Sequence, residues 1–264
     1  MKSDTKQRPR IGIPMRLEST TDRFYLSRFY SEAIEAAEAI PLHISLIPNA
    51  EYVNEAVDGL DGILLPGSDS DVDPQRYCHE PHRRLGTVQP IKDETDLLVI
   101  AAAERKGIPL FAICFGMQIL NVYRGGTLIQ DIESQVSDSI KHEQGAPRDR
   151  RSHSVKLLPG SMLEQLAGGE HQAVNSHHHQ AVDVIGRDLI ATAWATDGLV
   201  EAFEDPRPEP FVMAVQWHPE LGWENDEFSQ AIFRHFIERV NENSKRRTAA
   251  EVRMPQTETA STSK

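Results

Sequence analysis

Residues 109–118 are Pro-Leu-Phe-Ala-Ile-Cys-Phe-Gly-Met-Gln. The apolar, β-prone run before Cys114 indicates a buried strand, and the residues after it begin a helical pattern. A cysteine at such a sharp turn is lifted out of the core and aimed at a cleft, beside the free N–H groups of the first helical turn. The stretch therefore predicts a strand–turn–helix unit that carries a candidate nucleophile.

The chain before this stretch alternates strand-like and helix-like segments. Strands are expected at 10–14, 42–47 and 62–67, and helices at 24–40, 50–57 and 93–106. Continuous apolar strands between amphipathic helices indicate an α/β fold with a mostly parallel central sheet covered by helices on both faces. Ligands bind such sheets at the carboxyl ends of the strands, where Gly67 and Cys114 both fall. We therefore expect these two residues to lie close together.

The second half of the chain is richer in short strands. They are expected at 155–158, 172–174, 189–194, 200–204 and 211–216, followed by a closing helix at 228–242. Residues 68–90 show no clear period and contain several Pro and Gly residues, which predicts a long loop of the kind that is often functional. The sequence thus predicts a smaller β-rich part after the parallel sheet.

The formal net charge of the 264-residue chain is −12, and both ends are basic, so the body is more acidic than the whole. An acidic body argues against a nucleic-acid partner, because binding to phosphates needs a basic face. The ends are polar and short of apolar residues, so we expect a flexible tail at 1–9, one domain at 10–242 and a disordered tail at 243–264.

The cellular location is constrained by three simple observations. The chain has two cysteines, which suits a reducing compartment. It lacks an apolar run near the ~20 residues of a membrane span, and its first residues lack the apolar core of a signal peptide. We therefore expect a soluble cytoplasmic protein with no membrane partner.

Residues 216–220, Gln-Trp-His-Pro-Glu, supply the groups that a cysteine nucleophile needs. His218 and Glu220 are two positions apart and project to the same side of an extended segment. The imidazole could face the thiol while the carboxylate orients its far N–H. A helix N-terminus and an imidazolium both favour a thiolate, so Cys114, His218 and Glu220 fit an acyl-transfer enzyme. The alternative is a buried free cysteine and an unrelated histidine at a strand end.

Other polar residues are less specific. Gly67 could let backbone N–H groups approach an oxyanion, or it could be an ordinary turn residue. Three consecutive histidines, residues 177–179, alternate sides on an extended chain, so we expect a polar loop lining the cleft and no metal site. The remaining loop-like histidines are expected to be solvated: His79, His82, His142 and His153.

Seven motifs together resemble the class I glutamine amidotransferase-like superfamily, and within it the peptidase C26 branch typified by γ-glutamyl-γ-aminobutyrate hydrolases. The likeness spans about residues 10–240. The motifs are LLPGSDSDVDPQRY at 64–77, KDETD at 92–96, PLFAICFGMQ at 109–118, GGTLIQD at 125–131, VNSHHHQAV at 174–182, DGLVEAFE at 197–204 and AVQWHPE at 214–220.

The resemblance implies a flavodoxin-like three-layer fold and a Cys114–His218–Glu220 triad. It implies an oxyanion hole made by the backbone N–H groups of Gly67 and Phe115. It also implies that Gln118 contacts the glutamyl group and that three neighbouring residues lie near its α-amino and carboxylate groups, namely Asn175, Ser176 and His177.

By the same resemblance, the chain is expected to hydrolyse the γ-glutamyl amide bond of a small γ-glutamyl amine through a thioester, without a cofactor, as in putrescine degradation. Two other functions stay open: a glutaminase subunit that donates ammonia to a separate synthetase, and a non-catalytic binding module. The oligomeric state also stays open, a homodimer included. Phe115 stands where that branch often has Arg, so its side chain is expected to border the substrate. Residues 137–152 form a basic loop without an assigned role.

Overall fold

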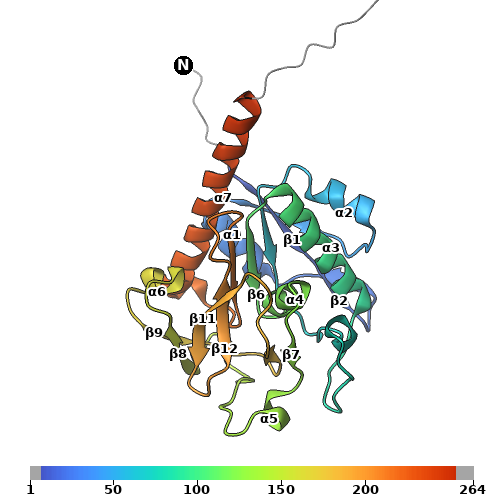
Figure 1. The fold of residues 1–264 in the computed structure, drawn as a ribbon, viewed down its shortest axis with the longest axis vertical. Helices are drawn as coiled ribbons and strands as arrows, with labels where there is room; N and C mark the ends of the chain where they lie inside the picture. Colours follow the sequence, from blue (N-terminus) through green and yellow to red (C-terminus); the bar gives the residue numbers. More distant parts are fainter. Residues whose placement is uncertain (1–6, 254–264) are drawn as a thin grey trace, which may run out of the picture.

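The computed structural model describes residues 7–253, which are built around one central sheet (Figure 1). Five of its strands are parallel and lie in the order β4-β1-β5-β6-β13. Their bounds are Arg10–Pro14 for β1, Ile40–Ile44 for β4, Gly62–Leu65 for β5, Leu110–Ile113 for β6 and Val212–Val215 for β13. The last three are buried along their whole length, as the apolar sequence of a two-sided parallel sheet requires.

The strands of the second half extend the same sheet in antiparallel fashion. Beyond β13 the order continues with β12 (Val200–Glu204), β11 (Ile190–Ala195), β8 (His153–Leu157) and β9 (His171–Val174). A short strand β10 (Ala181–Val182) pairs with both β12 and β7 (Leu128–Ile129). The β-rich part expected from the sequence is therefore continuous with the parallel strands.

Helices cover both faces of the sheet and complete a three-layer α/β fold, as predicted (Figure 1). One face packs against α1 (Arg28–Ala36), α6 (Met162–Ala167) and α7 (Glu227–Arg253). The other packs against α2 (Ala50–Val57), α3 (Pro90–Lys106) and α4 (Phe115–Tyr123). The remaining elements are β2 (Arg16–Glu18), β3 (Arg23–Tyr25), α5 (Ile132–Gln135) and two 3₁₀ turns, Pro74–Tyr77 and Trp223–Asn225.

The helix expected at 24–40 is shorter than predicted. Phe24 lies in β3, which forms a hairpin with β2, and Ile40 begins β4. The helix ends at Ala36, and Glu38 then adopts a left-handed φ of 66°, which turns the chain toward the sheet. Helical spacing of apolar residues continues across this turn, which is why the pattern overestimates the helix.

The predicted tails are wrong where the structure describes them. Helix α7 continues to Arg253, and polar side chains in the segment expected to be disordered contact the body of the protein. Asn243 donates to the carbonyl of Gly107 at 2.9 Å, and Ser244 donates to the Asp61 carboxylate at 2.9 Å. At the other end, the carbonyl of Pro9 accepts a hydrogen bond from Ile40. The rest of both predicted tails, residues 1–6 and 254–264, lies outside the described residues.

Within the described residues, every helix is too short or too polar to cross a bilayer.

Candidate active site

Cys114 lies at a strained turn between β6 and α4, where the sequence predicts a nucleophile. Its φ of 52° and ψ of −108° are unfavourable for a residue with a side chain, and strain of this kind is typical of a nucleophile held between a strand and a helix. A Cβ at Gly116 would lie 2.3 Å from the carbonyl oxygen of Leu65, so only glycine lets α4 approach β5 this closely. The sulfur is therefore fixed at the carboxyl end of the parallel sheet.

His218 reaches the same place because β13 is the neighbour of β6. Val215 pairs with Ile113 in register, and the N–H of Cys114 donates to the carbonyl of Val215 at 2.8 Å. The chain leaves β13 three residues before His218, on the side of the sheet edge where Cys114 lies. The structure thus brings together two predicted site residues that are about a hundred positions apart in the sequence.

Glu220 orients the imidazole of His218. Its Oε1 lies 2.7 Å from Nδ1 of His218, and both side chains are buried. Burial by itself lowers the pKa of His218, but the negative charges of Glu220 and Cys114 outweigh it and raise the pKa to about 10. Burial likewise favours a neutral Glu220, but His218 and the Tyr30 hydroxyl keep its pKa below the usual value. The geometry therefore favours an imidazolium between a carboxylate and the sulfur.

Asn175 and Ser176 bind backbone groups near the site. The Asn175 side chain donates to the carbonyl of His218 at 2.7 Å and accepts from its N–H at 2.8 Å. Ser176 is fully buried and donates from its hydroxyl to the carbonyl of His142 at 2.6 Å. Neither residue lines the cleft beside Cys114. Both side chains therefore hold backbone groups in place, and their contact with a substrate stays a prediction.

The predicted oxyanion donors differ in their availability. Phe115 is the first residue of α4, where the helix has no carbonyl partner for the N–H group. The N–H of Gly67, by contrast, donates to the hydroxyl of Tyr30 at 3.0 Å, and the carbonyl of Gly67 accepts from Arg16. The N–H of Gly67 is therefore occupied in this arrangement of the backbone, and its role as an oxyanion donor stays a prediction. A Cβ at Gly67 would lie 2.7 Å from Cε1 of His218, so the glycine is needed for space.

A cleft of about 510 Å³ lies next to the sulfur. Its walls include the segment after β5 and part of the 137–152 loop, for which the sequence gives no role. Among its lining residues are Cys114, Gln118 and His177, as predicted, together with Asp69, Asp71, Glu143 and Arg148. The amide of Gln118 donates at 3.2 Å both to the carbonyl of Gln180 and to the side chain of Gln216, which fixes its orientation.

Phe115 does not border the cleft with its side chain, which corrects the expectation from the sequence. The ring is fully buried in the core between the sheet and α3, with the ammonium of Lys92 5.0 Å from its centroid. Only the backbone of Phe115 is placed to act on a substrate. The presence of Phe115 where the family branch often has Arg therefore changes the core and not the wall of the cleft.

Two residues near the site were missed in the sequence analysis. Arg16 is buried and donates to the hydroxyl of Tyr30 at 3.1 Å, so both hold the segment that begins at Gly67. Arg16 follows β1 by two positions at the edge where ligands bind in parallel sheets, and that placement could have identified it. Tyr30 gives no such signal, because it has the spacing of an ordinary core residue in α1.

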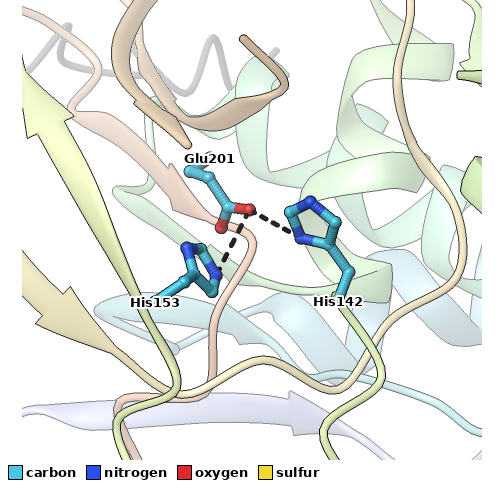
Figure 2. Close-up of side chains that lie close together, drawn as sticks. All are labelled: His142, His153 and Glu201. Atoms are coloured by element: carbon cyan, nitrogen blue, oxygen red, sulfur yellow. Dashed lines mark ion pairs between the residues drawn. The ribbon is translucent and has the colours of Figure 1, made fainter. Parts of the chain in front are cut away.

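The three consecutive histidines diverge, as their alternation predicts. His177 lies 2.8 Å from the carbonyl of Arg148, and His179 lies 2.8 Å from the Asp71 carboxylate, whereas His178 points into the protein toward Glu201. The prediction that His142 and His153 are solvated is wrong, since both side chains are buried against Glu201 (Figure 2). These buried groups are the described residues best suited to hold a metal ion.

Comparisons with known proteins agree with the fold and identify the family. Residues 9–220 match the Peptidase C26 family. A glutamine amidotransferase-like protein of Lactococcus lactis, YvdE, is 41% identical over 191 residues, covering 72% of this chain and 78% of its own. The γ-glutamyl-γ-aminobutyrate hydrolase PuuD of Escherichia coli is 34% identical, covering 87% of this chain and 92% of its own.

The fold is shared with a solved glutaminase domain, that of CTPS from Trypanosoma brucei with bound acivicin. The two superpose with a TM-score of 0.61 at 16% identity, covering 89% of this chain and 94% of that domain. At this identity the likeness concerns the fold alone.

Proposed function

The chain belongs to the peptidase C26 family of glutamine amidotransferase-like hydrolases, and we propose that it cleaves the γ-glutamyl amide bond of a small γ-glutamyl amine such as γ-glutamyl-γ-aminobutyrate. The observation that carries this proposal is the strained Cys114 beside an imidazole that Glu220 orients, at the mouth of a polar cleft. No cofactor takes part in the proposed reaction.

In the proposed mechanism, the Cys114 thiolate attacks the γ-carbonyl carbon of the bound substrate. The N–H of Phe115 stabilises the oxyanion of the tetrahedral intermediate, and the imidazolium of His218 protonates the departing amine. The resulting thioester is hydrolysed by a water molecule that gives its proton to the now neutral His218, which releases glutamate and restores the thiolate. Glu220 stabilises the imidazolium throughout.

A second oxyanion donor would require a change of partner. The Gly67 N–H is bound to the Tyr30 hydroxyl, and it could serve the oxyanion only after leaving that acceptor. The oxyanion is charged and would be a stronger acceptor than a neutral hydroxyl. We infer that substrate binding draws this N–H away from Tyr30.

The charges in the cleft support a zwitterionic substrate. Asp69, Asp71 and Glu143 are the carboxylates among its lining residues, and Arg148 is the cation. A γ-glutamyl compound carries an ammonium and a carboxylate at its α-carbon, so it offers one charge to each sign of side chain. His177 lies between these groups and the imidazole of His218. Its Nε2 is 2.8 Å from the carbonyl oxygen of Arg148, and the ring centroids of His177 and His218 are 5.9 Å apart.

The experiment is a hydrolysis assay of the purified full-length protein with γ-glutamyl-γ-aminobutyrate, other γ-glutamyl amines and glutamine. Glutamate release is expected with at least one γ-glutamyl amine and is expected to vanish in Cys114→Ala. Cys78→Ala is the matched control, because Cys78 is the other free cysteine and is exposed. Activity retained in Cys114→Ala, or absence of release from every γ-glutamyl amine, would refute the proposal.

A second function is favoured by relatives such as the glutamine amidotransferase-like protein YvdE, which is 41% identical to this chain. A glutaminase subunit would use the same three residues and pass ammonia to a separate synthetase. It would hydrolyse glutamine better than any γ-glutamyl amine and would co-purify with a synthetase. A non-catalytic module is less well supported, because the orientation of His218 by Glu220 and the strain at Cys114 are both retained.

The cytoplasmic location expected from the sequence is part of the same proposal. The mechanism needs a free thiol at Cys114, and a reducing compartment maintains it. Measuring the activity of protein treated with an oxidant and then with a thiol reductant would test this requirement.

A further inference from the structure

Four buried side chains converge behind the cleft, away from Cys114. They come from separate parts of the chain: His142 from the loop before β8, His153 from the start of β8, His178 from the loop after β9, and Glu201 from β12. The exposed fraction of each of these side chains is at most 6%. Figure 2 shows the Glu201 carboxylate between the imidazoles of His142 and His153. The mechanism proposed above uses none of the four.

The separations of the Glu201 carboxylate from the three imidazoles are close to the edge of a coordination tetrahedron. Oε1 of Glu201 lies 3.4 Å from Nδ1 of His142, 3.5 Å from Nε2 of His178 and 3.8 Å from Nε2 of His153. Ligands at roughly 2.0–2.1 Å from a tetrahedral ion lie roughly 3.3–3.4 Å apart. One ligand atom from each of His142, His153 and Glu201 lies within 4.8 Å of the others, so these three residues could reach a single ion by small side-chain movements. His178 lies outside this group and its Nε2 faces Glu201, so its ring would have to move further to join them.

The facing atoms have no hydrogen-bond partner of acceptable geometry among the described residues. This holds for Nδ1 of His142, for Nε2 of His153 and His178, and for both carboxylate oxygens of Glu201. Buried polar atoms are almost always partnered, and a group of five at one point is therefore unusual. The unpartnered atoms are those that a central ion would bind.

The outer nitrogen of each imidazole faces an acceptor that would fix the ring. Nε2 of His142 lies 2.9 Å from the Asp197 carboxylate, and Nδ1 of His178 lies 2.9 Å from the carbonyl of Gln180. Nδ1 of His153 lies 3.4 Å from the carbonyl of Ser154. A metal-binding histidine usually donates its second N–H to a carboxylate or a carbonyl in this way, which leaves the other nitrogen free to coordinate.

The charges also suit a dication. Glu201 and Asp197 are both buried carboxylates in contact with His142. An imidazole coordinates a metal ion in its neutral form, so one divalent ion would balance these two carboxylates.

We propose that His142, His153, His178 and Glu201 bind one divalent transition-metal ion of the zinc class, at a structural site behind the cleft. Three imidazoles and one carboxylate suit Zn²⁺ and its neighbours, whereas Mg²⁺ and Ca²⁺ take mainly oxygen ligands. With the ring of His178 drawn in, four protein ligands would close the tetrahedron and leave no position for a substrate. The site has a structural role because it ties together two segments of the cleft wall, at 143–148 and at 177–180.

The test is metal binding by full-length Cys114→Ala protein, in which the catalytic thiol cannot supply a ligand. After dialysis against a chelator and then Zn²⁺, we expect one zinc per chain by elemental analysis and a higher melting temperature than without metal. Co²⁺ in place of Zn²⁺ should give the visible absorption of tetrahedral cobalt without a thiolate charge-transfer band.

Two variants and a control locate the site. His153→Gln removes a ligand and is expected to abolish stoichiometric binding. Asp197→Asn removes an outer contact and is expected to weaken zinc binding about 10–100-fold, as is typical of such partners. His171→Gln, at an exposed histidine of the neighbouring strand β9, is expected to bind like the parent protein.

The proposal is overturned if folded protein takes up no zinc above the level of His153→Gln, or if cobalt gives no tetrahedral spectrum. Should His153→Gln fail to fold, the cobalt spectrum of the parent protein and the zinc affinity of Asp197→Asn decide the question. None of these readouts depends on hydrolysis, so a failure here is separate from a failure of the proposed function.

Discussion

The sulfur of Cys114 and the imidazole of His218 form one electrostatic unit, which can be tested by titration. The charge of Cys114 is one of the causes that raise the pKa of His218, after that of Glu220. In Cys114→Ala the pKa of His218 is therefore expected to fall below its value in the parent protein, while Glu220 still holds it above that of a free histidine. NMR titration of the His218 ring measures this, with Cys78→Ala as the control, and an unchanged pKa would show that the sulfur carries no charge beside the ring.

The same histidine makes stability depend on pH. Its pKa is raised from 6.5 to about 10 in the folded protein, so the folded state holds a proton that the unfolded chain releases in this range. This contribution of His218 to the free energy of unfolding is fully present below pH 6.5. It is lost as the pH rises to about 10, at up to roughly 1.4 kcal/mol per pH unit. Urea unfolding of the parent protein and of His218→Gln at several pH values measures the difference. A difference that stays constant from pH 6.5 to 10 would contradict the assignment.

Asn175 is expected to affect turnover without touching the substrate. Both of its hydrogen bonds are to the backbone of His218, and its side chain does not line the cleft. Asn175→Ala should lower kcat by about 100-fold, the effect of a small misplacement of a catalytic group, with little change in KM. Steady-state kinetics measure this, with Asn225→Ala at an exposed position as the control. A change in KM alone would instead support the substrate contact that the sequence predicts for Asn175.

At the scale of elements, the close approach of α4 to β5 depends on Gly116. A methyl group there would meet the backbone carbonyl of Leu65, which cannot rotate away as a side chain could. Gly116→Ala is expected to destabilise the fold by about 1–3 kcal/mol, as overpacking does, and to displace Cys114. Gly169→Ala is the matched control, because a Cβ at that position meets nothing within 4 Å. Urea unfolding and glutamate release report the two effects, and equal behaviour of the two variants would refute the argument.

The same scale separates what local sequence determines from what it does not. Strand β1 and helix α2 have the bounds that the apolar pattern predicts, because each is decided by neighbours along the chain. The end of α1 and the length of α7 depend on tertiary contacts, such as that of Asn243 with Gly107, which no local pattern encodes. The hairpin of β2 and β3 was missed for a similar reason, since short strands have little periodicity.

The site divides in the same way. Cys114, His218 and Glu220 stand out because a cysteine at a strand–helix turn and a His-Pro-Glu run at a strand end together suit nucleophilic catalysis, and the structure brings them together. The hydrogen-bond partners of Gly67 and Asn175 depend on side-chain directions at junctions between elements, so the sequence could not predict them. The cluster around Glu201 could not be predicted because its members are spread over about sixty positions of the sequence.

At the scale of the whole molecule, the cleft lies where the parallel and antiparallel parts of the sheet meet. Strand β13 belongs to both, since it is parallel to β6 and antiparallel to β12. The proposed nucleophile comes from the parallel part, while the histidine-rich wall comes from the loops of the antiparallel part. Substitutions in the antiparallel part can therefore change substrate preference without disturbing the strand–helix turn at Cys114.

The central position of β13 also has a consequence for protein synthesis. This strand is made after the other described strands of the sheet, yet it inserts between β6 and β12, which are made earlier. A nascent chain that ends before Val212 has its sulfur but neither the proposed base nor the strand that brings the base to it. The proposed reactivity is thus delayed until β13 has been made, and a polypeptide that stops earlier does not expose an activated thiolate to the cell.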